Sequence, residues 1–133
     1  MTRFAIDSPI ALRLIRENVN VSNEHQLVAP AILRSHALSA LYREVREGRM
    51  DAAAGRRALD GVAELKVRLL GDRVSRATAW KIAEQLDWGD TSLAEYLAVA
   101  KLQADALVTD DDVLAAAAEG IVPLASWDDL TRT

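Results

Sequence analysis

Acidic side chains follow two short apolar segments that lie far apart in the sequence. Thr109 and the acids at 110–112 come directly after the apolar residues 106–108, and Asp7 follows the apolar residues 4–6. Open α/β sheets bind their ligands beyond the carboxyl ends of the strands, which is where both acidic segments would lie. Carboxylates from two strand ends can bind a divalent cation that activates water against a phosphodiester. The pattern indicates a metal-dependent phosphodiesterase, although a complete site of this kind needs further acids.

The composition limits the classes of protein to be considered. The chain has 133 residues, of which 50% are hydrophobic and 27% charged, as expected for one globular domain. Its net charge of -4 disfavours a dedicated nucleic-acid carrier but is compatible with a nuclease that holds an acidic metal site. The absence of cysteine excludes disulfides, zinc–thiolate sites and cysteine nucleophiles.

The distribution of apolar residues indicates a cytoplasmic protein. Residues 1–7 contain no apolar stretch of the length found in signal peptides. No other segment approaches the roughly 18 consecutive apolar residues of a membrane-spanning helix. We therefore expect a protein that works in the cytoplasm and has no membrane partner.

Short strands alternate with helices along the predicted chain. Strands are predicted over 4–6, 26–29, 66–70 and 106–109, with an edge-like strand over 121–124. Helices are predicted to start after Asp7 or Ser8 and to run over about 31–47, 51–63, 73–86, 92–102 and 112–119. This alternation favours an α/β fold with a small, mostly parallel sheet between helices.

Four segments resemble the PIN-domain family and, within it, the VapC-type toxins of prokaryotic toxin–antitoxin operons. The matching residues are Ile6-Asp7-Ser8, Ser35 to Leu41, Ala94 to Ala100, and Val108 to Asp111 with Leu114. The resemblance implies a single three-layer PIN-like domain over 1–133. It also implies an endoribonuclease that cleaves RNA with Mg²⁺ or Mn²⁺ held by three or four acids.

The resemblance assigns two of the expected metal-site acids and leaves two replaced. Asp7 matches the first acid, and Asp111 matches the acid of the family's Thr-x-Asp-x-x-Leu pattern. Thr109, in the same pattern, would position water or a phosphate oxygen. The family's second acid, a Glu, falls at His36, and its third, an Asp, falls at Leu93. A Mg²⁺ site would therefore lack two carboxylates.

The replacement at His36 leaves two interpretations open. As a nitrogen ligand, His36 could complete a one-metal site with Asp7 and Asp111 that prefers Zn²⁺ or Mn²⁺ to Mg²⁺. Alternatively, His36 could hydrogen-bond one of these acids in a pocket without metal, where its positive charge would replace that of the ion. The second interpretation is the commoner use of a histidine.

Two further acids could substitute for the missing ligands. Asp90 lies three residues before Leu93, so it would share a helix face with Leu93 if the helix begins early enough. Its other role is to cap that helix together with Thr91. Asp112 could assist at the metal or cap the helix that follows it. Capping is the commoner role for acids in both places.

Two functions follow from the ligand count and the resemblance. The favoured one is a VapC-like PIN-domain protein with weakened or lost ribonuclease activity, acting as a toxin–antitoxin component or an interaction module. The alternative is an active Mg²⁺- or Mn²⁺-dependent endoribonuclease toxin that uses Asp7, Asp111 and either Asp90 or Asp112. For both, the resemblance implies a homodimer and a cognate antitoxin, and for the second an RNA substrate.

Overall fold

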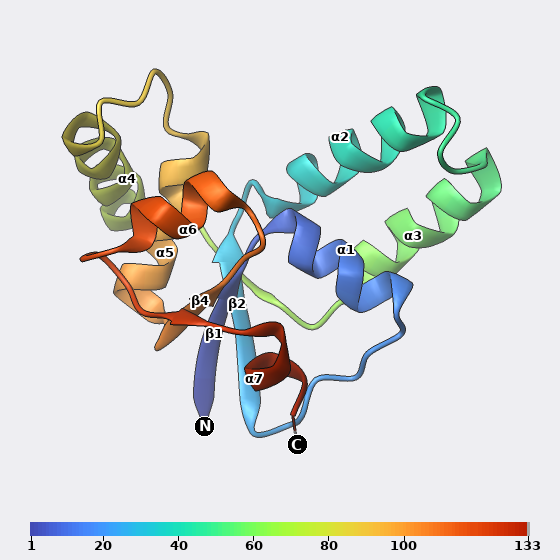
Figure 1. The fold of residues 1–133 in the computed structure, drawn as a ribbon, viewed down its shortest axis with the longest axis horizontal. Coiled ribbons are helices and arrows are strands. Elements are labelled where there is room, and N and C mark those ends of the chain that lie inside the picture. Colours follow the sequence, from blue (N-terminus) through green and yellow to red (C-terminus); the bar gives the residue numbers. More distant parts are fainter. Residues whose placement is uncertain (133) are drawn as a thin grey trace.

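Five strands form one parallel sheet in the computed structural model, which describes residues 1–132 (Figure 1). The strand order is β3-β2-β1-β4-β5. The strands are β1 (Thr2–Ile6), β2 (His25–Pro30), β3 (Arg68–Leu70), β4 (Ala106–Val108) and β5 (Leu124–Ala125). The order reverses direction between β1 and β4, which makes that boundary the topological switch point of the sheet.

The register places the carboxyl ends of β1 and β4 side by side. Phe4 pairs with Ala106, and Ile6 pairs with Val108. On the other side of β1, Phe4 pairs with Leu27. All pairings are parallel, so every strand points its carboxyl end to the same edge of the sheet. The acidic segments that follow β1 and β4 are consequently brought together.

Seven helices flank the sheet within the described chain. They are α1 (Ser8–Arg16), α2 (Leu33–Arg46), α3 (Ala52–Glu64), α4 (Arg73–Gln85), α5 (Ser92–Gln103), α6 (Asp112–Ala118) and α7 (Trp127–Thr131). The predicted cap Asp51 accepts a hydrogen bond from the Ala54 amide at the start of α3. Gly48 adopts φ +77° directly after α2, a conformation that favours glycine over other residues at a helix end.

The helices form layers on the two sides of the sheet. Figure 1 shows α4 and α5 to one side of the strands and α1, α2 and α3 to the other. Helix α5 contacts β1, β2 and β4 as well as α4, and its residues Tyr96 to Ala100 are all buried. A second, smaller hydrophobic cluster joins α1, α2 and α3 through Leu12, Ala37, Leu41 and Val62. This α/β architecture agrees with the three-layer fold predicted from the sequence.

The last part of the chain differs from the prediction. The edge strand comprises Leu124–Ala125, whereas the sequence suggested 121–124. Proline has no amide hydrogen, so Pro123 contributes only its carbonyl, which accepts a hydrogen bond from the Leu107 amide at 2.9 Å. The short helix α7 was not predicted. It begins with a capping box, in which Ser126 and Asp129 each accept a hydrogen bond from the backbone amide of the other.

The length and hydropathy of the helices bear on whether any of them could span a membrane. Across residues 1–132, none of the helices combines the length and the apolar character that a bilayer crossing demands. The longest of them, α2, has 14 residues and carries arginines along its length.

The close approach of α1 and α3 gives a testable packing prediction. A Cβ atom on Gly61 would lie 2.7 Å from Cγ2 of Ile15, which cannot move without shifting α1. Gly61→Ala should therefore lower the free energy of unfolding by about 1–2 kcal/mol, although alanine is the better helix former. Urea denaturation measures the change. Gly89→Ala, which meets nothing within 4 Å, is the control and should be neutral. A stabilised Gly61→Ala protein would contradict this packing.

Candidate functional site

Asp7 lies at the carboxyl end of β1 and begins α1. Its side chain is almost fully buried, with 3% of the residue exposed. Oδ1 accepts a hydrogen bond from the Ile10 amide at 3.0 Å, which makes Asp7 the N-cap predicted from the sequence. Oδ2 accepts a hydrogen bond from the Thr109 hydroxyl, which comes from the end of β4. Both carboxylate oxygens are thus held in fixed directions.

Thr109 connects Asp7 to the second acid of the site. Its hydroxyl oxygen accepts a hydrogen bond from the Asp111 amide at 3.0 Å while donating to Asp7. Asp111 in turn caps α6, because its Oδ1 accepts from the Leu114 amide at 2.9 Å. Asp7, Thr109 and Asp111 therefore form one connected group across β1 and β4, at the switch point of the sheet.

The electrostatic environment opposes ionisation of Asp7. Burial raises the pKa of its carboxyl above the ordinary range, and the negative charges of Asp111 and Asp110 raise it further. The hydrogen bonds from Thr109 and Ile10 act in the opposite direction but do not reverse the shift. Asp7 is therefore a buried acid that holds its proton more strongly than it would in water, an arrangement common at functional sites.

His36 lies on α2 and is bound to a residue that the sequence reasoning did not select. Its Nδ1 is 2.7 Å from the hydroxyl of Tyr96 on α5, and the two rings are stacked with centroids 5.6 Å apart. The predicted hydrogen bond from His36 to Asp7 or Asp111 is absent from the described residues, so that expectation was wrong. The nearest sequence signal was the position of Tyr96, one helical turn after Leu93 on the same face.

Tyr96 forms a hydrogen bond with His36, and its pKa responds to the charge of Asp7 at the end of β1. The Tyr96 side chain is buried, and burial raises the pKa of its phenol well above the ordinary value. The negative charge of Asp7 raises this pKa further. Tyr96 is therefore a neutral hydroxyl that pairs with His36 and lies within electrostatic reach of Asp7.

Leu93 and Asp90 line a hollow of their own, whose lining does not include Asp7, Thr109 or Asp111. Leu93 is half-buried and lines a hollow of about 290 Å³ together with Trp88, Asp90, Ser92 and Val113. Asp90 is exposed and accepts a hydrogen bond from the Ser92 amide at 2.8 Å, just before α5. This bond lowers the pKa of Asp90, with a smaller contribution from the positive charge of His36. Asp90 therefore accepts from the first amide of α5, whereas the N-cap position is held by Thr91 without a side-chain cap bond, and Asp90 lies within electrostatic reach of His36.

The remaining acids of the β4 loop point toward solvent. Asp112 is exposed in the first turn of α6. Asp110 is exposed and lies 3.7 Å from the guanidinium of Arg13, which also forms an ion pair with Glu17 at 2.8 Å. The Arg13 guanidinium lies 3.9 Å above the ring of Trp127. The Arg13 side chain therefore interacts with Glu17, Asp110 and Trp127 instead of pairing with the buried Asp7.

The side chains present do not fit a complete magnesium centre. Within residues 1–132, no three His, Asp or Glu side chains lie close enough to hold one metal ion. Two metal ions about 3.5–4 Å apart would need more carboxylates than Asp7 and Asp111 provide. The other predicted ligands, His36, Asp90 and Asp112, remain predictions.

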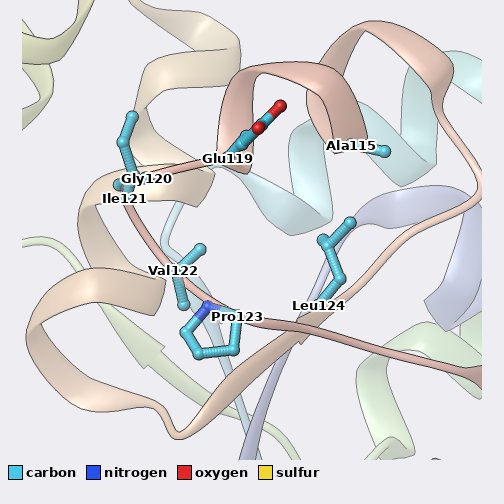
Figure 2. A pocket seen from close by; sticks show the side chains of 7 residues that line it. All are labelled: Ala115, Glu119, Gly120, Ile121, Val122, Pro123 and Leu124. Carbon is cyan, nitrogen blue, oxygen red and sulfur yellow. The ribbon is translucent and has the colours of Figure 1, made fainter.

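A separate hollow of about 690 Å³ lies beside the edge strand, away from the acids. Figure 2 shows its lining, which comprises Ala115 and Glu119 of the α6 region and the segment from Gly120 to Leu124. Glu119 is the only charged residue among them. With one titratable group and no partner for it, this hollow offers no catalytic arrangement, and the candidate site stays at the switch point.

Comparisons with known proteins support the fold. No protein-family model and no curated protein sequence matches the chain. Among solved structures, PAE2754 from Pyrobaculum aerophilum is similar with a TM-score of 0.75 and 24% identity, covering 98% of this chain and 93% of that one. VapBC2 from Rickettsia felis, solved with a DNA fragment from its promoter, has a TM-score of 0.64 and 10% identity, covering 95% and 99%. These similarities show that the chain has a PIN-like α/β fold.

Proposed function

We propose that this PIN-like protein is a relative of VapC-type toxins whose ribonuclease centre is reduced, and that it acts mainly by binding a protein partner. One observation carries the proposal. Thr109 joins Asp7 and Asp111 at the switch point, but the two positions where the family resemblance places further acids hold His36, which is bound to Tyr96, and Leu93, which can supply no ligand. A weak or lost ribonuclease activity follows from the missing oxygen ligands.

The burial of Asp7 indicates that this carboxylate does more than cap helix α1. Asp51 and Asp72 cap α3 and α4 with the same type of hydrogen bond, and both are exposed. Capping therefore does not require a buried carboxylate. Within the described residues, no cation pairs with Asp7, so its burial costs free energy that capping alone would not explain. A site inherited from a cation-binding ancestor accounts for this cost.

A working ribonuclease is the second candidate, and the position of Asp90 favours it. Both substitute acids are exposed, but Asp90 is the one whose pKa is lowered by the charge of His36. A shift of the loop before α5 could bring Asp90 toward Asp7 and Asp111. In that form the protein would use Mg²⁺ or Mn²⁺, or Zn²⁺ if His36 became a ligand.

The proposed partners follow from the fold and the neighbour structures. The VapBC2 neighbour is a complex bound to promoter DNA, which supports an antitoxin-like protein as the partner of this chain. A homodimer and a cytoplasmic location are also part of the proposal. RNA would be the substrate in the active form.

Removal of the Asp7 charge should stabilise the fold. Because the pKa of Asp7 is raised in the folded state, the folded protein binds more protons than the unfolded one just above the ordinary aspartate range. The stability associated with Asp7 is therefore present at low pH and is lost as pH rises through its folded pKa. Asp7→Asn keeps an oxygen for the Ile10 amide and turns the Oδ2 acceptor into an amide donor, from which the Thr109 hydroxyl oxygen can accept. With the buried charge removed, the variant should have a higher thermal midpoint at pH 7 and lose this advantage near pH 4. An Asp7→Asn protein that is less stable than wild type at pH 7 would contradict the description of the site.

Restoring the missing acids should restore magnesium binding. His36→Glu combined with Leu93→Asp adds two carboxylates around Asp7 and Asp111, so Mg²⁺ affinity measured by calorimetry should rise roughly tenfold or more. Trp80→Glu combined with Val74→Asp adds two carboxylates at exposed positions of α4 that line neither this site nor its hollow, and serves as the control. If the two double variants bind Mg²⁺ equally, the assignment of His36 and Leu93 to the site is wrong.

The cleavage of a structured RNA separates the two candidate functions. With Mg²⁺, Mn²⁺ or Zn²⁺, wild type should show little or no cleavage, and the His36→Glu, Leu93→Asp variant should gain it. Adding Asp7→Asn to that variant should abolish the gain. Strong cleavage by wild type that depends on metal, and that is lost in Asp7→Asn and in Asp90→Asn, would instead establish the active ribonuclease.

A further inference from the structure

A second apolar stripe runs along the outer face of α2. The inner stripe, with Ala37 and Leu41, is buried in the cluster between α1, α2 and α3. The outer stripe comprises Leu38, Tyr42 and Val45, which follow the i, i+4, i+7 spacing of one helix face. Leu38 is 50% exposed and Tyr42 is 65% exposed. Val45 packs against Gly55 of α3, whereas Leu38 and Tyr42 are left exposed within residues 1–132.

Helix α3 supplies the other wall of a groove beside this stripe. A hollow of about 250 Å³ is lined by the outer stripe of α2, by Leu41 beneath it, and by Ala52, Gly55, Arg56 and Leu59 of α3. The α3 residues also follow the i, i+3, i+4, i+7 spacing. Leu59 is 37% exposed. Two helices that present matched apolar stripes to one hollow form the kind of groove into which amphipathic helices bind.

Arginines flank this groove and no acid lines it. A neighbouring hollow of about 370 Å³ is lined by Leu38, Ser39, Tyr42 and Arg43, so the two hollows share the exposed Leu38 and Tyr42. Together they are called the α2–α3 groove below. Arg43 lines one part and Arg56 the other. Within residues 1–132, neither arginine forms an ion pair. The groove therefore combines an apolar floor with two uncompensated positive charges.

We propose that the α2–α3 groove binds an amphipathic helix of a partner protein, with apolar residues on the groove floor and carboxylates beside Arg43 and Arg56. This identifies the surface used for partner binding in the proposed function and rests on that part of it. A second copy of this chain fits less well. In a symmetric dimer the same patch meets itself, which would bring the arginines of one groove toward those of the other.

The groove lies on a different face of α2 from the candidate site. Leu38 follows His36 by two residues, a rotation of about 200° around the helix axis. His36 contacts Tyr96 on α5, whereas Leu38 lines the groove toward α3. A helix bound in the groove would therefore leave Asp7 and Asp111 uncovered. Partner binding and the chemistry of the acids can be changed by separate substitutions.

A designed peptide tests the groove without knowledge of the natural partner. The probe is a fluorescent helical peptide of roughly 14 residues, matched to the 14 residues of α2, with leucines at i, i+4 and i+7 flanked by glutamates. A second peptide carries lysines in place of the glutamates. Fluorescence anisotropy should show that the full protein binds the acidic peptide more tightly than the basic one.

Substitutions on the groove should weaken this binding, and a matched surface change should not. Leu38→Gln with Tyr42→Gln should raise the Kd at least about tenfold. Arg43→Glu with Arg56→Glu should reverse the preference between the two peptides. Trp80→Gln, which removes an apolar side chain that is 64% exposed on α4, is the control and should leave the Kd unchanged. All the substituted side chains are exposed, so the fold should survive.

Three results would overturn the proposal. The first is the absence of binding of either peptide to the wild type, or binding that Leu38→Gln with Tyr42→Gln does not weaken. The second is a wild-type homodimer, seen by sedimentation, that the same variant converts to monomer, because the occupant would then be a second copy. The third is binding of an RNA oligonucleotide that depends on Arg43 and Arg56 and excludes the peptide. Each leaves the reduced ribonuclease centre standing, since the metal and cleavage measurements on Asp7 and His36 test that separately.

Discussion

The hydrogen bond between the Thr109 hydroxyl and the Asp7 carboxylate is the interaction on which the candidate site depends. It joins the ends of β1 and β4, which are adjacent in the sheet although 102 residues separate the two partners. The same hydroxyl accepts the Asp111 amide, so one side chain positions both acids and the start of α6. Because Ile10 fixes the other oxygen of Asp7, the direction of the carboxylate is set by the strand ends and not by a mobile loop.

The two acids are therefore held in fixed positions, but the further acids that a metal ion would need in the proposed centre are not present within residues 1–132. Asp7 is buried without a compensating cation, and Asp110 and Asp111 add to its electrostatic cost. The cation nearest to this loop, Arg13, is held by Glu17, Asp110 and Trp127. An active metal centre would be stabilised by the ion it binds. In this chain His36 is instead paired with Tyr96, and this pairing supports the proposal that partner binding outweighs catalysis.

Local signals in the sequence predicted most of the fold, and long-range packing accounts for the parts that were missed. Asp7 before Pro9 and Gly48 after α2 are local signals, and both mark helix ends as expected. The meeting of Asp7 with the segment after β4 followed from the rule that parallel strands end at one edge, whereas the bond from the Thr109 hydroxyl to Asp7 was not predicted. The bond between His36 and Tyr96 has no local signal, because it depends on how α2 and α5 cross, with 60 residues between the partners.

Helix α2 connects the two functional surfaces of the molecule. One face carries His36 toward α5 and the acids, a second carries Leu41 into the cluster with α1 and α3, and a third carries Leu38 and Tyr42 into the α2–α3 groove. A helix with all three faces in use tolerates few changes of register, since one residue of slip would rotate each face by about 100°. Core packing through Leu41 thus fixes the rotation of α2 independently of the side chain at position 36 and of the chemistry at the strand ends.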